Sequence, residues 1–250
     1  MMSVISIANQ KGGVGKSTTA INLSAALALK GKNVLLVDMD PQGATTIGLG
    51  LREATPTIYN VIIDEAEIEE VVVKTPIDGL HLVPSNIALS GAEIELSSQI
   101  GREYILRNKL SKLKRNYDYI IIDTPPSLGV LTMNSLVASD EVIIPIQAEY
   151  YALEGIALLL KAIRLVRDRL GIPLEIKGFL ITMFDKRTNL SKEVREEVKR
   201  TFGEKVFKTM IPRNVRLAEA PSYGRPIFLY APDSRGAKAY MKLAEEVDGK

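Results

Sequence analysis

The chain has 250 residues, of which 46% are hydrophobic and 25% are charged, and its formal net charge is +2. This composition is typical of a soluble globular protein and excludes intrinsic disorder and collagen-like repeats. The sequence contains no cysteine and a single histidine, His81, which excludes disulfides, thiolate zinc sites and cysteine-ligated iron–sulfur clusters and disfavours a multi-histidine metal site or a Ser/His/Asp triad.

Short apolar runs alternate along the chain with longer segments of helical periodicity. The runs that predict strands are Val4–Ala8, Val34–Val37, Leu80–Val83, Ile120–Ile122, Val142–Ile146, Phe179–Met183 and Val206–Ile211. The segments that predict helices are about 16–30, 86–115, 130–138, 151–170, 190–202 and 235–247, with a break expected near 97–101. This alternation predicts a single α/β domain over residues 1–250, a doubly wound, mostly parallel twisted sheet with helices on both faces.

A glycine-rich segment, Asn9–Thr19, follows the first predicted strand and opens the first predicted helix. Its sequence, NQKGGVGKSTT, lets the backbone turn tightly and aim N–H groups inward, which forms an anion cradle at a helix N-terminus. Lys16 adds a positive charge for the β- and γ-phosphates of a nucleotide, and the Ser17 hydroxyl is placed to ligate Mg²⁺. The general P-loop pattern has a glycine where this chain has Gln10, and this loop contains a second lysine, Lys11.

Two later strands end in aspartates. Val34–Val37 leads into Asp38 and Asp40, and Ile120–Ile122 leads into Asp123. In an open α/β sheet, ligands bind outside the carboxyl ends of the strands. An aspartate there can hold a metal-bound water or orient an attacking water, so the two segments favour a nucleotide-hydrolysing site at the edge that carries the glycine-rich loop.

These residues together resemble the ParA/MinD group of ATPases, whose mark is a deviant Walker A loop of the pattern KGGxGK[ST]. Asp38–Gly43 is similar to the second aspartate motif of that group, and Ile120–Pro126 is similar to its Walker B motif. Glu149–Gly155, which includes Tyr150 and Tyr151, and Ile211–Ser222 are similar to the chromosomal ParA (Soj) branch in particular. The similarity runs from about residue 3 to residue 247.

The resemblance implies ATP and Mg²⁺ as cofactors and assigns residues to each. Those implied to bind the phosphates are Lys11, Gly12, Gly13, Val14, Gly15, Lys16, Ser17 and Thr18. Pro212 and Asn214 are implied to lie against the adenine. Ser17 is implied to bind Mg²⁺, Asp123 to hold it through water, and Asp38 is a further candidate for the metal shell.

The resemblance also implies catalytic roles and partners. Asp40 would position the hydrolytic water and act together with Lys16, while Lys11 would reach the phosphates of the opposite subunit in an ATP-dependent sandwich homodimer. Arg187 and Arg216 would belong to a basic surface that holds double-stranded DNA without reading its sequence. A ParB-like centromere-binding protein would stimulate hydrolysis and so release the dimer from the nucleoid.

The distribution of charge bears on the DNA surface. Residues 1–150 hold 12 basic and 17 acidic side chains, a net charge of −5, and residues 151–250 hold 20 and 13, a net charge of +7. The segment 177–216 alone carries 11 basic and 5 acidic residues. Such asymmetry indicates either a polyanion-binding face or solvated helix faces, and both interpretations stay open at this point.

The sequence disfavours two alternatives to a DNA-partitioning ATPase. A metal-carrier or reductase relative needs interface cysteines, which this chain lacks. A MinD-like ATPase that positions the division site needs a basic amphipathic C-terminal helix that inserts into lipid. Here the apolar residues of the last helix fit docking on the core, and Glu245, Glu246 and Asp248 would be repelled by anionic lipid.

Two further features of the sequence bear on the cellular location of the protein. The chain contains no run of 18 uninterrupted apolar residues, and its first residues lack the basic and apolar regions of a signal peptide. We therefore expect a cytoplasmic, nucleoid-associated protein without membrane contact.

Overall fold

The computed structural model describes residues 2–114, 116–149, 153 and 155–249. The strands in these residues are β1 (Ser3–Ile7), β2 (Val34–Asp38), β3 (Val73–Lys74), β4 (Leu80–Val83), β5 (Tyr119–Asp123), β6 (Glu141–Gln147) and β7 (Glu175–Thr182). They form one sheet in the order β3-β4-β2-β5-β1-β6-β7. Each neighbouring pair is parallel except β3 with β4, which is antiparallel.

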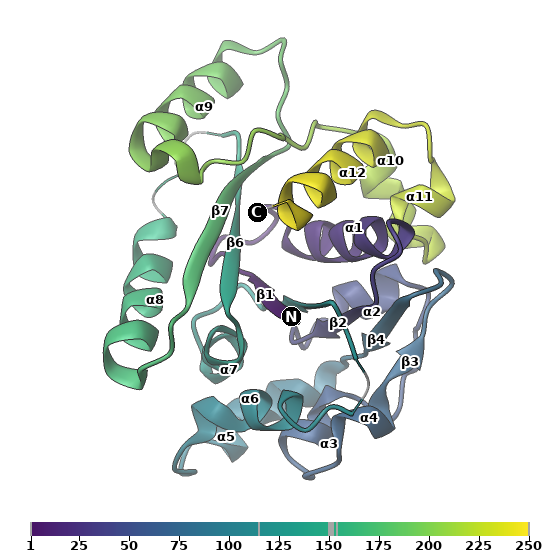
Figure 1. Ribbon diagram of the computed structural model, residues 1–250, viewed down its shortest axis with the longest axis vertical. Helices are drawn as coiled ribbons and strands as arrows, with labels where there is room; N and C mark the ends of the chain where they lie inside the picture. The colour runs from purple at the N-terminus through teal and green to yellow at the C-terminus, as the bar shows by residue number, and fades with distance from the viewer. Residues whose placement is uncertain (1, 115, 150–152, 154, 250) are drawn as a thin grey trace.

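Helices cover both faces of this sheet (Figure 1). The longer ones are α1 (Lys16–Leu29), α7 (Val130–Ala138), α8 (Ile156–Leu170), α9 (Asn189–Phe202) and α12 (Arg235–Asp248). The shorter ones are α2 (Ala44–Gly48), α3 (Ile58–Ile62), α4 (Ile68–Val71), α5 (Ala92–Glu95), α6 (Ile105–Leu110), α10 (Val215–Glu219) and α11 (Ile227–Tyr230). The predicted doubly wound α/β fold is confirmed.

The central strands are buried on both faces, which explains why they read as continuous apolar runs. Along β2, Leu36 packs in the cluster formed with α1 and α12, while Leu35 and Val37 pack in the opposite cluster with α3, α6 and α7. Successive side chains of a strand point to opposite faces, so one apolar run serves two cores. A third cluster fills the space between β6, β7, α8 and α9.

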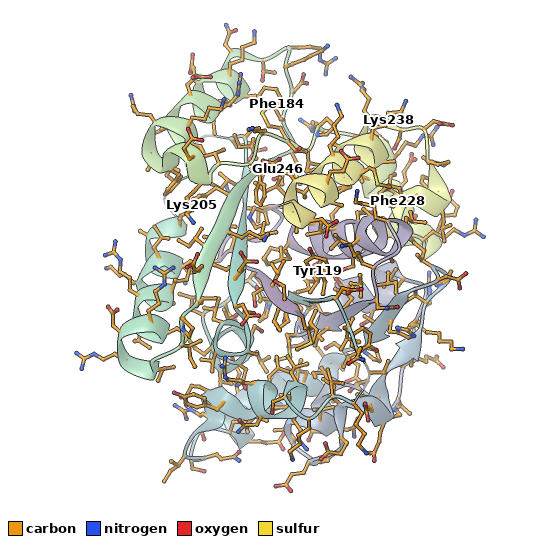
Figure 2. The ribbon with its side chains drawn as sticks, in the orientation of Figure 1. Tyr119, Phe184, Lys205, Phe228, Lys238 and Glu246 are labelled. Carbon is orange, nitrogen blue, oxygen red and sulfur yellow. The ribbon has the colours of Figure 1, made fainter. Side chains whose placement is uncertain are left out.

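The predicted strand Val206–Ile211 is wrong. The segment runs beside β7, where the Phe207 N–H donates to the Phe179 carbonyl at 3.0 Å. In its middle, however, the Lys208 and Thr209 N–H groups donate to the carboxylate of Glu246 on α12, at 2.8 and 3.1 Å (Figure 2 labels Glu246). Because those two amides bind a side chain, the ladder is interrupted and only isolated bridges form.

Other boundaries differ less. The predicted helix 86–115 is broken as expected, since α5 and α6 are separated by a turn in which Gly101 has a φ of +74°. The predicted helix 151–170 is described as α8 from Ile156 onward, and residues 150–152 and 154 lie outside the described residues. No helix in the described part of the chain is long and apolar enough to cross a membrane.

Candidate nucleotide-binding site

The glycine-rich loop joins the end of β1 to the start of α1. Gly13 and Gly15 have φ values of +75° and +88°, in the left-handed region that favours glycine. Neighbouring strands hold the loop in place. The Thr182 hydroxyl at the end of β7 donates to the Val14 carbonyl at 2.8 Å, and Asn9 Nδ2 donates to the Pro145 carbonyl of β6 at 2.7 Å.

Lys16, the first residue of α1, lies inside this loop. Its side chain is mostly buried, and Nζ donates to the Lys11 carbonyl at 3.4 Å. Burial lowers the pKa of Lys16, while the charges of Asp123 and Asp40 raise it. The charge of the ammonium group therefore interacts with both aspartates, which agrees with the predicted convergence of the loop and the strand-end carboxylates.

Asp38 and Asp123 end the neighbouring strands β2 and β5 and are register partners. Both are fully buried. Burial raises the pKa of Asp38 to about 7, and the Asp123 carboxylate adds to this rise. Burial likewise raises the pKa of Asp123 to about 6, against the lowering effect of the Ser17 and Thr45 hydroxyls and of Lys16. A cation beside two buried carboxyl groups relieves their mutual repulsion, so this pair favours a metal ion next to the glycine-rich loop.

The two aspartates differ in how their oxygens are used. Asp38 accepts hydrogen bonds from the Asp40 N–H, the Thr46 N–H and the Thr46 hydroxyl, at 3.1, 2.9 and 2.7 Å. Asp123 Oδ2 accepts from the Thr45 hydroxyl at 2.7 Å, whereas Oδ1 is buried and accepts no hydrogen bond from the described residues. The free oxygen of Asp123, beside Ser17, fits a magnesium-bound water, and Asp38 holds the turn that leads into α2.

Asp40 lies in that turn. It is buried, its Oδ1 accepts a hydrogen bond from the Gln42 N–H at 2.9 Å, and its carbonyl accepts from the Gly43 N–H at 2.9 Å. Its charge acts on both Lys16 and Asp123. The turn thus holds the Asp40 carboxylate close to the loop that would bind the γ-phosphate.

A cavity of about 330 Å³ adjoins the loop. Pro212 and Asn214, which the resemblance assigned to adenine, line it together with the loop residues Gly15 and Thr18. Its size is at the lower end of small-molecule pockets. Met183, Leu217 and Tyr240 also line the cavity, and no motif in the sequence indicates this. Tyr240 is one of the apolar residues with which the last helix docks on the core, and its hydroxyl lies 3.2 Å from that of Thr19.

Arg187 and Arg216 do not line this cavity, and each is paired with a carboxylate. Arg187 makes a two-pronged contact with Asp185, with a shortest N–O distance of 2.6 Å, and Arg216 pairs with Glu219 at 3.0 Å. The three-residue spacing of Arg216 and Glu219 is visible in the sequence, whereas the pair of Arg187 with Asp185 is not, because a turn and not helix spacing brings those two side chains together. Of the segment Glu149–Gly155, Tyr150, Tyr151, Ala152 and Glu154 lie outside the described residues.

Comparisons with known proteins agree with this geometry. A family model described as "AAA domain" matches residues 2–176. The sporulation initiation inhibitor protein Soj of Bacillus subtilis is 55% identical over 249 residues, covering 99% of this chain and 98% of that protein. The chromosome partitioning protein ParA of Caulobacter vibrioides is 48% identical over 250 residues, covering 98% and 94%.

A solved structure is similar over the same length. The protein described as cobyrinic acid a,c-diamide synthase from Mycobacterium smegmatis, with bound ATP analog and magnesium, superposes with a TM-score of 0.86 at 38% identity. The match covers 98% of this chain and 93% of that one. The ligands in that structure are those predicted here from the glycine-rich loop.

Proposed function

The chain belongs to the ParA/MinD family of P-loop ATPases, in its Soj/ParA branch, and we propose that it is an ATP-hydrolysing DNA-partitioning protein that uses Mg²⁺. The observation that carries the proposal is the meeting of Lys16, Asp40 and Asp123 at one loop beside a cavity lined by Pro212 and Asn214. We propose further that residues 1–250 form one ATPase domain, because β1 and β7, from distant parts of the sequence, share one sheet.

Side chains and backbone groups of this chain account for the binding of ATP. The loop N–H groups and the Lys16 ammonium neutralise phosphate charge, and the cavity beside Gly15 and Thr18 takes the adenine. Ser17 and the free Oδ1 of Asp123 would hold Mg²⁺, directly and through water. Mg²⁺, when bound, supplies charge neutralisation for the β- and γ-phosphates.

For hydrolysis, Asp40 orients the attacking water. Its backbone is fixed by the turn to Gly43, so the carboxylate is held before the nucleotide arrives. Preorganisation of this kind acts mainly on the chemical step and less on ground-state binding. Lys11 complements the site from the opposite subunit of an ATP-bound dimer, and its half-exposed side chain agrees with such a role.

The ATP-bound dimer holds double-stranded DNA of the nucleoid, through Arg187 and Arg216, without reading sequence. Both arginines are exposed and lie on the basic part of the chain. Dimerisation doubles the number of phosphate contacts and so links DNA retention to ATP. A ParB-like centromere-binding protein then stimulates hydrolysis and releases the dimer.

The MinD-like alternative, an ATPase attached to a membrane, is disfavoured by α12. Its apolar residues Tyr240, Leu243 and Val247 are buried in the core cluster that they form with α1. The face that would enter lipid is therefore already covered.

The proposed function is tested by measuring phosphate release from Mg·ATP, with and without duplex DNA and a centromere-binding protein, together with co-sedimentation on anionic liposomes. We expect slow hydrolysis that both macromolecules together accelerate, and no ATP-dependent pelleting with liposomes. ATP-dependent liposome binding without any effect of DNA would instead support the membrane alternative.

A further inference from the structure

A second cavity lies beside the nucleotide pocket and is lined by the loop after β7, the segment from Arg213 to Arg216 and the loop into α12. Figure 1 shows these three segments at one end of the molecule. The volume of the cavity is about 660 Å³, within the range of small-molecule pockets. Figure 2 labels Phe184, in the loop after β7, and Lys238, on α12, at this end of the molecule. Among its lining residues are Arg187, Arg213, Arg216 and Arg235.

The four arginines are not equivalent. Arg187 and Arg216 are held by Asp185 and Glu219, as described above. Arg213 and Arg235 make no side-chain hydrogen bond or ion pair with any other described residue. The hydrogen bonds from Arg187 lower the pKa of Asp185, and the charge of Arg213 adds to this lowering. Two guanidinium groups in one concavity thus retain their full capacity for hydrogen bonds to an anion.

One carboxylate, that of Asp233, also lines the cavity. With Arg187 and Arg216 engaged by Asp185 and Glu219, two guanidinium groups stand against this one carboxylate, so the lining keeps a net positive charge. Guanidinium groups bind phosphate oxygens in a planar, two-pronged geometry, and they are preferred where several phosphates must be recognised. The chemistry of the cavity fits a ligand with two or more linked phosphates.

The cavity is distinct from the phosphate loop. None of the loop residues Lys11–Thr18 lines it, whereas the segment Arg213–Val215 lines both it and the adenine cavity. A ligand in the arginine-lined cavity would therefore leave the phosphate loop free for a nucleotide. It would bind Arg213 and Arg235 and lie beside Arg187 and Arg216, which the proposed function assigns to DNA.

We propose that the arginine-lined cavity is a second phosphate site, which binds a small, free polyphosphate such as a short inorganic polyphosphate or the phosphates of a second nucleotide. Such a ligand displaces DNA from Arg187 and Arg216. This second consequence rests on the proposed DNA binding, whereas the binding of the small ligand does not.

The test is titration calorimetry with inorganic tripolyphosphate on the full chain, whose phosphate loop is first saturated with ADP in excess Mg²⁺. We expect one further site per chain. Arg235→Ala should weaken it about tenfold or more, because the change removes a charge-assisted, two-pronged contact. Arg169→Ala, an exposed arginine in the last turn of α8, should leave it unchanged.

The proposal is overturned if the ADP-saturated protein does not bind tripolyphosphate. It is also overturned if the Arg235→Ala and Arg169→Ala variants bind it equally well.

A second experiment measures how far tripolyphosphate displaces a labelled duplex in the presence of ATP, compared with sulfate at equal ionic strength. Equal displacement by both salts would show that the salts only screen the charge of the DNA, and it would contradict the claim that the ligand competes with DNA. Failure of the duplex to bind at all, with the calorimetric site intact, would contradict the proposed function and leave the second phosphate site standing.

Discussion

The Thr45 hydroxyl, in the first turn of α2, donates a 2.7 Å hydrogen bond to Oδ2 of Asp123 at the end of β5. The segment Asp40–Gly43, which precedes α2, is thereby connected to the carboxylate proposed to hold the metal-bound water. The Thr46 hydroxyl makes the corresponding contact to Asp38. The position of Asp40 thus depends on two buried carboxylates, and one of them, Asp123, also interacts with Lys16 and Ser17 of the phosphate loop.

Thr45→Val should destabilise the protein, since the substitution keeps the shape of the side chain but leaves Asp123 Oδ2 without its donor. The expected loss in the free energy of unfolding is about 1–3 kcal/mol, the cost of an unsatisfied buried polar group. Urea unfolding measures it. Thr201→Val is the matched control, because Thr201 is exposed and bonds only to its own helix, and it should change stability by about 0.5 kcal/mol or less. Equal losses in both variants would contradict the assignment.

Lys16→Ala should abolish nucleotide binding. The substitution removes a charge-assisted contact to phosphate that contributes on the order of 1.5–3 kcal/mol or more. Calorimetric titration with ATP tests this, with circular dichroism to show that the variant is folded. Lys199→Ala, an exposed lysine on α9, is the control. Unchanged ATP affinity in Lys16→Ala would exclude the phosphate-loop assignment.

Asp40→Ala should leave ATP binding intact and stop turnover, because a carboxylate that orients water contributes to the hydrolytic step. The variant should accumulate as an ATP-bound dimer. Single-turnover phosphate release, together with light scattering, measures both effects. Hydrolysis at the native rate would mean that Asp40 serves only to hold the turn to Gly43.

Lys11→Ala should bind ATP but stay monomeric, in contrast to Lys16→Ala. The Lys11 backbone holds the loop through Asn9 and Lys16, and those contacts do not need its side chain. Light scattering with ATP, in the Asp40→Ala background, separates the two lysines. A stable ATP-bound dimer without the Lys11 side chain would refute its role across the interface.

The sequence predicted the sheet and the nucleotide loop well for a physical reason. Central strands buried on both faces must be apolar throughout, and the loop needs glycine at positions 13 and 15, where φ is positive. Both features can therefore be recognised in the local sequence. The prediction of a strand at Val206–Ile211 was wrong because Glu246, far along the chain, binds the Lys208 and Thr209 amides that a strand would have used.

Contacts between loops that are distant in the sequence could not be predicted from the sequence either. The free oxygen of Asp123 and the saturated oxygens of Asp38 depend on where Thr45 and Thr46 point, which no spacing indicates. The arginine-lined cavity is assembled from three separate segments, so the role of Arg213 and Arg235 becomes visible only in the fold.

The central claim is that ATP switches the protein onto DNA through phosphate contacts. Its most direct test is a salt titration by fluorescence anisotropy on two unrelated duplexes, with ATP and with ADP. We predict ATP-dependent, sequence-independent binding that falls steeply as salt rises. The salt slope should be shallower in Arg187→Ala and Arg216→Ala but not in the control Arg52→Ala, which changes an exposed arginine in the loop after α2. Equal binding with ATP and ADP, or a slope that neither arginine substitution alters, would contradict the account.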